Sequence, residues 1–191
     1  MVREASADNA ASCVSSKYHT VSAAYRLQKV TDAITEASEQ FDLGFVDIGG
    51  WDTHVNQGAA SGNLANRLSD LSQGLATFAE SMGADVWRHT VVAVISEFGR
   101  TFRENGNKGT DHGHGTAYWF LGGGLSAQAG GKVLGEQIEV TEKTLFQNRD
   151  YPVLNEYRSV LGGLFSRMYG LSAQQLQQIF PASAAGKLQL V

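Results

Sequence analysis

An apolar run at residues 90–95, TVVAVI, constrains the fold of this chain more than any other feature. Nearly all of its residues are β-branched, and such residues favour strands. An unbroken run of this kind is typical of a strand that is covered on both faces, as in a parallel sheet. We therefore expect a buried strand here, in a protein that has layers on both sides of its sheet.

Stretches with helical periodicity lie before and after this run. In each of them apolar residues recur at spacings of three and four, which indicates an amphipathic helix. These stretches are residues 21–41, 64–82 and 154–168. Gly83 and Gly170 predict where the second and third helices end. Ser172 with Gln175 predicts a capping box and a short last helix.

Further short apolar runs predict other strands. They are residues 43–48, 117–121 and 132–140. Strands that alternate with helices predict an α/β layered domain. We expect one domain over residues 21–181, preceded by a polar leader at 1–20 and followed by a tail at 182–191, because 191 residues suit one domain better than two.

Charge and composition argue against several classes of protein. The formal net charge of −4 gives no basic surface for nucleic acid. No apolar run approaches the roughly 20 residues needed to cross a bilayer, and residues 1–20 contain no apolar segment typical of a signal peptide. Cys13 is the single cysteine, which excludes an internal disulfide and argues against a cysteine-based metal site.

Glycine-rich polar clusters adjoin three of the expected strands. They are residues 49–54 (GGWDTH), 96–101 (SEFGRT) and 109–115 (GTDHGHG). The first two follow their strands, and ligands of open α/β sheets bind beyond the carboxyl ends of strands. The third cluster precedes its strand, so it reaches the same edge only if residues 117–121 run antiparallel to residues 90–95. We predict this antiparallel pairing.

The residue types in these clusters suit metal binding. Zinc and similar ions bind imidazole nitrogen and carboxylate oxygen, commonly through three or four protein ligands. The candidate ligands are Asp52, His54, Glu97, Asp111, His112 and His114. They could hold one divalent ion, or two as in many sites of phosphoryl transfer, and zinc, manganese and calcium all stay open. Arg100 is the candidate substrate-binding residue, since its guanidinium matches phosphate or sulfate oxygens.

Each candidate taken alone has a simpler explanation. Asp52 could cap a turn or the next helix, and His54 could be structural. Glu97 could form a solvated ion pair with Arg100 or Arg103, and Gly-Thr-Asp is a common turn sequence. The concentration of histidines in two short glycine-rich motifs favours metal binding for the constellation as a whole. No nucleophile is assigned, because neither Ser96 nor Thr101 lies in a nucleophile elbow.

The three motifs together resemble the bacterial family called domain of unknown function 1501. GGWDTH, SEFGRT followed by ENG, and GTDHGHG followed by a GG segment carry the resemblance over about residues 43–135, with a weaker likeness at 157–181. That family is grouped with the alkaline-phosphatase-like superfamily of phosphatases, sulfatases and phosphomutases. The resemblance implies a three-layer α/β/α fold with a mostly parallel sheet.

The resemblance also implies roles for particular residues. Asp52 and His54 would match the superfamily's Asp/His ligand pair after a central strand, and His112 or His114 its later single histidine ligand. Glu97-Phe98 stands where relatives carry an Asp-His pair. Such relatives begin with a strand that supplies the first metal-binding Asp, and a nucleophile follows that strand. We find neither feature before residue 43. We therefore expect the chain to be the C-terminal part of a larger fold, truncated on its N-terminal side.

These observations lead to two expected functions. The first is a metal-binding hydrolase-like domain that cleaves phosphate or sulfate esters, with a small anionic ester or polymer as substrate. The second is a non-catalytic, metal-stabilised binding or structural module of the cell envelope. A sheet that lacks strands exposes an edge and apolar surface, so we expect a homodimer or pairing with a missing N-terminal segment. Export to the periplasm or cell envelope is implied by the family resemblance alone.

Overall fold

The structure, a computed structural model, describes residues 22–36 and 43–191, so the expected leader lies outside the described residues. The chain divides into two compact units, which we describe separately. Unit 1 comprises the described residues up to Trp87 together with Glu104–Thr110. Unit 2 comprises Arg88–Arg103 and Asp111–Val191.

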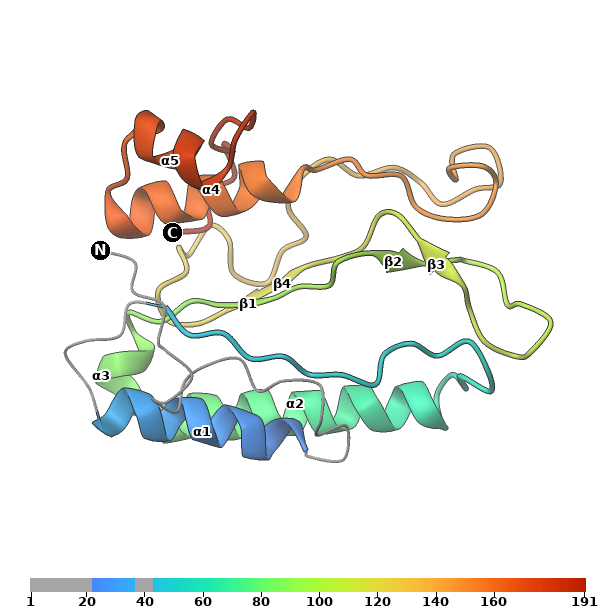
Figure 1. The fold of residues 1–191 in the computed structure, drawn as a ribbon, viewed down its shortest axis with the longest axis horizontal. Coiled ribbons are helices and arrows are strands. Elements are labelled where there is room, and N and C mark those ends of the chain that lie inside the picture. The colour runs from blue at the N-terminus through green and yellow to red at the C-terminus, as the bar shows by residue number, and fades with distance from the viewer. Residues whose placement is uncertain (1–21, 37–42) are drawn as a thin grey trace. The chain divides into compact units, whose positions relative to one another are not determined.

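Unit 1 is built on a pair of helices that lie side by side (Figure 1). Its helices are α1 (Ala23–Glu36), α2 (Asn63–Ser81) and the short α3 (Gly83–Trp87). Gly74 of α2 permits close packing, because a Cβ atom there would lie 2.9 Å from the backbone nitrogen of Ala24. The backbone N–H of Ala23 donates to Asp70 Oδ2 at 2.9 Å, which satisfies one of the unpaired donors at the start of α1.

The helices predicted in this unit are confirmed, and the strand is not. The predicted end at Gly83 is correct, since α2 ends at Ser81 with Met82 as its C-cap, and Gly83, with φ 70°, begins α3. Residues 37–41 of the first predicted helix lie outside the described residues. Residues 43–48 form no strand, because no described segment pairs with their backbone. Instead, the buried Arg26 donates through Nη1 to the carbonyl of Asp47 at 2.7 Å.

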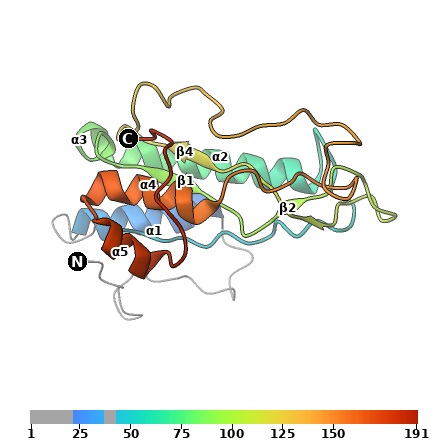
Figure 2. The ribbon, with the colours of Figure 1, turned by 90° about the horizontal axis from the view of Figure 1, so that it is seen from above.

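Unit 2 contains two small antiparallel sheets. Its strands are β1 (Val92–Val94), β2 (Gly99–Arg100), β3 (His112–Gly113) and β4 (Trp119–Leu121). β1 pairs with β4, with Val92 opposite Leu121, and β2 pairs with β3. The predicted antiparallel pairing of residues 117–121 with 90–95 is therefore confirmed. The chain runs from β1 to β2 and returns through β3 to β4, and β1 and β4 lie side by side in both views (Figures 1 and 2).

These sheets are smaller than the sequence predicts. The β1 strand covers half of the apolar run, and Ala93 at its centre is exposed. Residues 132–140 form no strand. The described residues are thus a mixture of helices and short antiparallel pairs, and the three-layer fold with a mostly parallel sheet stays a prediction.

Both helices predicted in unit 2 are present, and the first begins at Tyr157 rather than at residue 154. They are α4 (Tyr157–Tyr169) and α5 (Ala173–Ile179). The Glu156 side chain caps α4 by accepting from the backbone N–H of Ser159, and Gly170 ends the helix in the left-handed conformation. Ser172 and Gln175 form the predicted capping box at the start of α5.

The core of unit 2 includes the end of the chain, where the sequence has no readable signal. Leu190 is buried with Ala129 and with Leu164 of α4. The N–H of Ser126 donates to the carbonyl of Leu190 at 2.8 Å, which fixes the backbone of this segment. Within the part of the chain that the structure describes, no helix combines the length and apolar character that crossing a membrane requires.

Candidate metal centre

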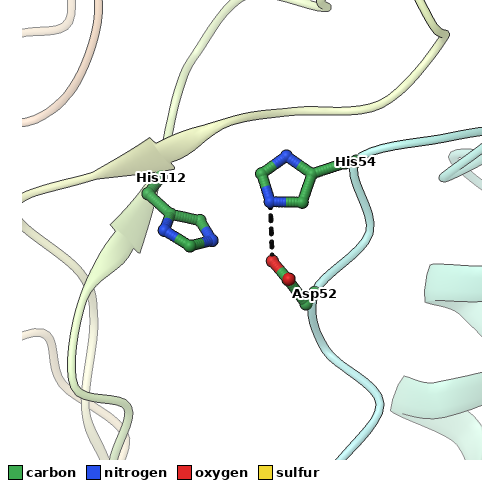
Figure 3. Close-up of side chains that lie close together, drawn as sticks. All are labelled: Asp52, His54 and His112. Carbon is green, nitrogen blue, oxygen red and sulfur yellow. Dashed lines mark ion pairs between the residues drawn. The ribbon is translucent and has the colours of Figure 1, made fainter.

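The first cluster lies on a tight loop of unit 1 whose side chains alternate inward and outward. Trp51 donates through Nε1 to the carbonyl of Ile48 at 2.7 Å. Thr53 is buried, and its hydroxyl donates to Gln57 Oε1 at 2.7 Å. The two flanking residues point toward each other, with His54 Nε2 2.8 Å from Asp52 Oδ1 (Figure 3). Their side chains are 37% and 66% exposed, so both remain accessible to a ligand.

Residues 104–110, also in unit 1, hold the backbone of this loop. The N–H of Thr110 donates to the carbonyl of Thr53 at 3.2 Å. The side chain of Asn105 donates through Nδ2 to the carbonyl of His54 at 3.1 Å. Gly109 is required for this close approach, because a Cβ atom there would lie 2.2 Å from the carbonyl carbon of His54. The main chain of the Asp52–His54 loop is therefore fixed by hydrogen bonds and backbone packing.

His112 belongs to unit 2, where it lies on β3. It is directly opposite Arg100 in the β2–β3 register. The Phe98 ring stacks on its imidazole with centroids 4.2 Å apart and planes 29° from parallel. Asp52, His54 and His112 form a candidate group of metal ligands, and each offers one ligand atom (Figure 3).

His114 is engaged elsewhere in unit 2. Its Nδ1 is 2.8 Å from Asp150 Oδ2, and its backbone N–H donates to the same oxygen at 2.7 Å. Arg149 Nε lies 3.0 Å from the other oxygen, Oδ1. Asp150 is completely buried. Burial alone would raise the pKa of Asp150, but the hydrogen bonds from His114 and Arg149 outweigh it and lower the pKa below its ordinary value.

Sequence reasoning missed Asp150. In the sequence it lies in a polar stretch, Gln-Asn-Arg-Asp, that looks like any exposed loop. Its burial arises from tertiary pairing, since its backbone bridges to both Thr101 and Phe146. No local pattern encodes that arrangement. An acidic residue beside an arginine, a few positions before the predicted helix, was the one available signal, and it is too common to be informative.

The other predicted ligands lie outside the candidate group. Glu97 is exposed, with its Oε2 3.5 Å from the hydroxyl of Ser96. Asp111 is also exposed, and its backbone pairs with Thr101. Arg103 donates to Glu142 at 3.0 Å, so the alternative in which Arg103 neutralises Glu97 is not what the structure shows.

Comparison with known proteins defines the family. The family described as "Protein of unknown function (DUF1501)" matches residues 19–180. The chain belongs to this family. No curated protein and no solved structure matches the chain. The DUF1501 match includes Asp52, His54 and His112, and also Asp150, but its description carries no activity. The chemistry has to be argued from the side chains.

The hydroxyl groups of Ser96 and Thr101 in this DUF1501 chain both donate to backbone carbonyls. Thr101 is buried, and its hydroxyl donates to the carbonyl of Arg103 at 3.0 Å. The same oxygen accepts from the N–H of Asp111 at 3.0 Å. The exposed Ser96 donates to the carbonyl of Phe98 at 3.0 Å. Thr101 therefore has a structural role in the turn between β2 and β3.

Proposed function

We propose that this DUF1501 chain binds one divalent metal ion through Asp52, His54 and His112 and hydrolyses phosphate or sulfate esters there. The donor set supports a zinc-like ion, since two imidazoles and a carboxylate are common zinc ligands. Three protein ligands leave a position for water or substrate, as in catalytic zinc sites. Calcium fits less well than zinc or manganese, because calcium prefers oxygen ligands.

The connectivity of the chain supports the grouping of the three ligands. Thr110 is bound to the Asp52–His54 loop through the carbonyl of Thr53. Asp111 and His112 follow it directly in the sequence. Two residues of extended chain span at most about 7 Å, so His112 is tethered close to the point where Thr110 is anchored.

The register of β2 and β3 is the observation that carries the ester part of the proposal. Arg100 and His112 are directly opposed in this antiparallel pair. Opposed residues project from the same face, with Cβ atoms about 4.5–5.5 Å apart. An anionic oxygen that binds beside His112 is therefore within reach of a guanidinium, which pairs well with phosphate and sulfate. In this proposal, the metal polarises the ester and Arg100 orients it.

Hydrolysis assays with a defined metal test the proposal. The protein is freed of metal, resupplied with zinc or manganese, and assayed with an aryl phosphate and an aryl sulfate. We expect metal-dependent turnover that is lost in His112→Ala and retained in His89→Ala, a control that removes an exposed histidine outside the three clusters. Arg100→Met should mainly raise KM. Turnover that survives in His112→Ala would contradict the proposal.

The second candidate function is a non-catalytic, metal-stabilised binding or structural module. The engaged hydroxyl of Thr101 favours it, because this buried group cannot attack an ester without breaking the turn between β2 and β3. Metal would then raise the thermal stability of the chain without any turnover. The relationship to alkaline-phosphatase-like enzymes is part of the first proposal and would lose its support with that result.

A further inference from the structure

The side-chain oxygen of Gln57 joins two segments of unit 1 that are far apart in the sequence. Gln57 Oε1 accepts from the hydroxyl of Thr53 at 2.7 Å and from the hydroxyl of Thr110, also at 2.7 Å. Both distances are typical of well-formed O–H···O hydrogen bonds. An amide oxygen has two lone pairs, so this one atom satisfies both donors.

The two threonines lie next to the proposed metal ligands. Thr53 is buried between Asp52 and His54 in the sequence, and Thr110 lies two residues before His112. The N–H of Thr110 also donates to the carbonyl of Thr53 at 3.2 Å. The contact between the two segments therefore combines one backbone hydrogen bond with the pair of side-chain bonds to Gln57.

The backbone of Gln57 is itself held on both sides. Its N–H donates to the carbonyl of Lys108 at 2.8 Å, and its carbonyl accepts from the N–H of Leu64 at 2.9 Å. Leu64 lies in the first turn of α2, so the position of Gln57 is tied to a long helix. The side chain is half-buried, and hydrogen bonds are stronger where water is partly excluded. Gln57 is thus a fixed point from which both threonines are held.

We infer that Gln57 is a positioning residue of the metal centre, acting through Thr53 and Thr110. The inference rests on the proposed function. Ligands on loops bind an ion more tightly when the loops are ordered before the ion arrives. Removing a group that orients a ligand directly lowers metal affinity about 10- to 100-fold. Since Gln57 acts one step further away, we expect the lower end of that range. A merely structural role would lower stability and leave metal affinity unchanged.

Hydrogen exchange of the metal-free protein tests the contact itself. Gln57→Leu removes the acceptor, and we expect the amide of Thr110 to exchange about tenfold faster, as for the loss of about one hydrogen bond. Gln57→Glu keeps an acceptor oxygen and should keep the slow exchange. The control Gln73→Leu removes an exposed glutamine of α2 and should change nothing. Unchanged exchange in Gln57→Leu, or equal acceleration in Gln57→Glu, would overturn the inference.

Zinc affinity, measured by competition with a chromophoric chelator, tests the positioning role. We expect about tenfold weaker binding in Gln57→Leu and unchanged binding in Gln73→Leu. Thr110→Val, a smaller change that leaves Gln57 in place, should weaken binding in the same direction. The double variant should bind no more weakly than Gln57→Leu, because the two changes remove the same hydrogen bond.

The zinc titration also separates this inference from the proposed function. If the parent binds zinc, His112→Ala does not, and Gln57→Leu binds as the parent does, the inference alone is overturned. If His112→Ala binds zinc as tightly as the parent, the proposed ligand group fails. If the parent binds no zinc, the proposed function fails and the positioning role falls with it.

Discussion

The two units each contain an Asp–His pair with the same 2.8 Å contact, but the pairs differ in which partner is buried. In unit 1, Asp52 is exposed and His54 is half-buried. In unit 2, Asp150 is completely buried and His114 is half-exposed. An exposed carboxylate gains little from such a contact, since surface ion pairs contribute about 0–1 kcal/mol. A buried carboxylate needs its donors, because an unpaired buried charge is very unfavourable.

The difference shows that contact distance alone does not identify a functional residue. The Asp52 side chain is 66% exposed, so we expect its contact with His54 to contribute little to folding. The carboxylate of Asp150 accepts hydrogen bonds from His114 and Arg149. The backbone of the same residue forms bridges to its neighbours in unit 2. We expect the first carboxylate to matter mainly for binding and the second mainly for stability.

Removal of each carboxylate should give the largest contrast. Asp150→Ala leaves the donors of His114 and Arg149 without their acceptor, and we expect a loss of about 2–4 kcal/mol in the free energy of unfolding. Asp52→Ala should cost under about 1 kcal/mol. Urea unfolding of both variants without metal measures the difference. Equal losses would contradict the assignment of different roles.

Backbone packing around the Asp52–His54 pair should come next in size. Gly109→Ala places a methyl group against the carbonyl of His54, and we expect a loss of about 1–3 kcal/mol from the displaced loop. Gly106→Ala is the matched control, because a Cβ atom there would meet nothing within 4 Å. Thermal unfolding compares the two. A stable Gly109→Ala protein would show that the loop does not depend on residues 104–110.

Acid should reduce the stability that Asp150 provides. Its pKa is lowered in the folded protein, so the native state holds fewer protons than the unfolded chain as the pH approaches the ordinary value for aspartate. The contribution is complete above that value and is lost as the pH falls through the folded pKa. The stability difference between the parent and Asp150→Asn should therefore shrink toward pH 3, as measured by urea unfolding. Glu156 also has a lowered pKa, but it affects both proteins equally.

The smallest effect should come from the aromatic contact of His112. Phe98→Leu removes the stacked ring, and we expect a loss of about 0.5–1.5 kcal/mol, seen as weaker zinc binding in a calorimetric titration. Phe102→Leu is the control, since this exposed ring packs on Tyr151 at 6.2 Å between centroids. If both variants bind zinc as the parent does, the stack has no part in orienting His112.

Local signals in the sequence predicted the helices well. The helix ends at Gly83 and Gly170 and the capping box at Ser172 depend on backbone conformation and nearby hydrogen bonds, which short motifs encode. The antiparallel pairing of β1 with β4 was also predictable. One polar cluster follows the first strand and another precedes the second, so the two clusters meet at the same edge only if the strands are antiparallel.

Features that depend on distant partners could not be predicted in this way. Residues 43–48 have the apolar character of a strand, but a strand exists only where a neighbour pairs with it, and none of the described residues does. The burial of Asp150 and of Leu190 likewise results from tertiary packing. The sequence could not show which of His112 and His114 belongs to the candidate group of ligands. The two histidines differ because His114 contacts Asp150, and the position of Asp150 is set by tertiary packing.

Metal content tests the central claim most directly. The parent protein and an Asp52→Ala, His112→Ala double variant are purified without chelator and dialysed to remove ions held by a single imidazole. Elemental analysis then gives the metal bound per chain. We predict about one zinc or manganese ion in the parent and none in the double variant, in line with a three-ligand site. No metal in the parent, or equal metal in both proteins, would contradict the account.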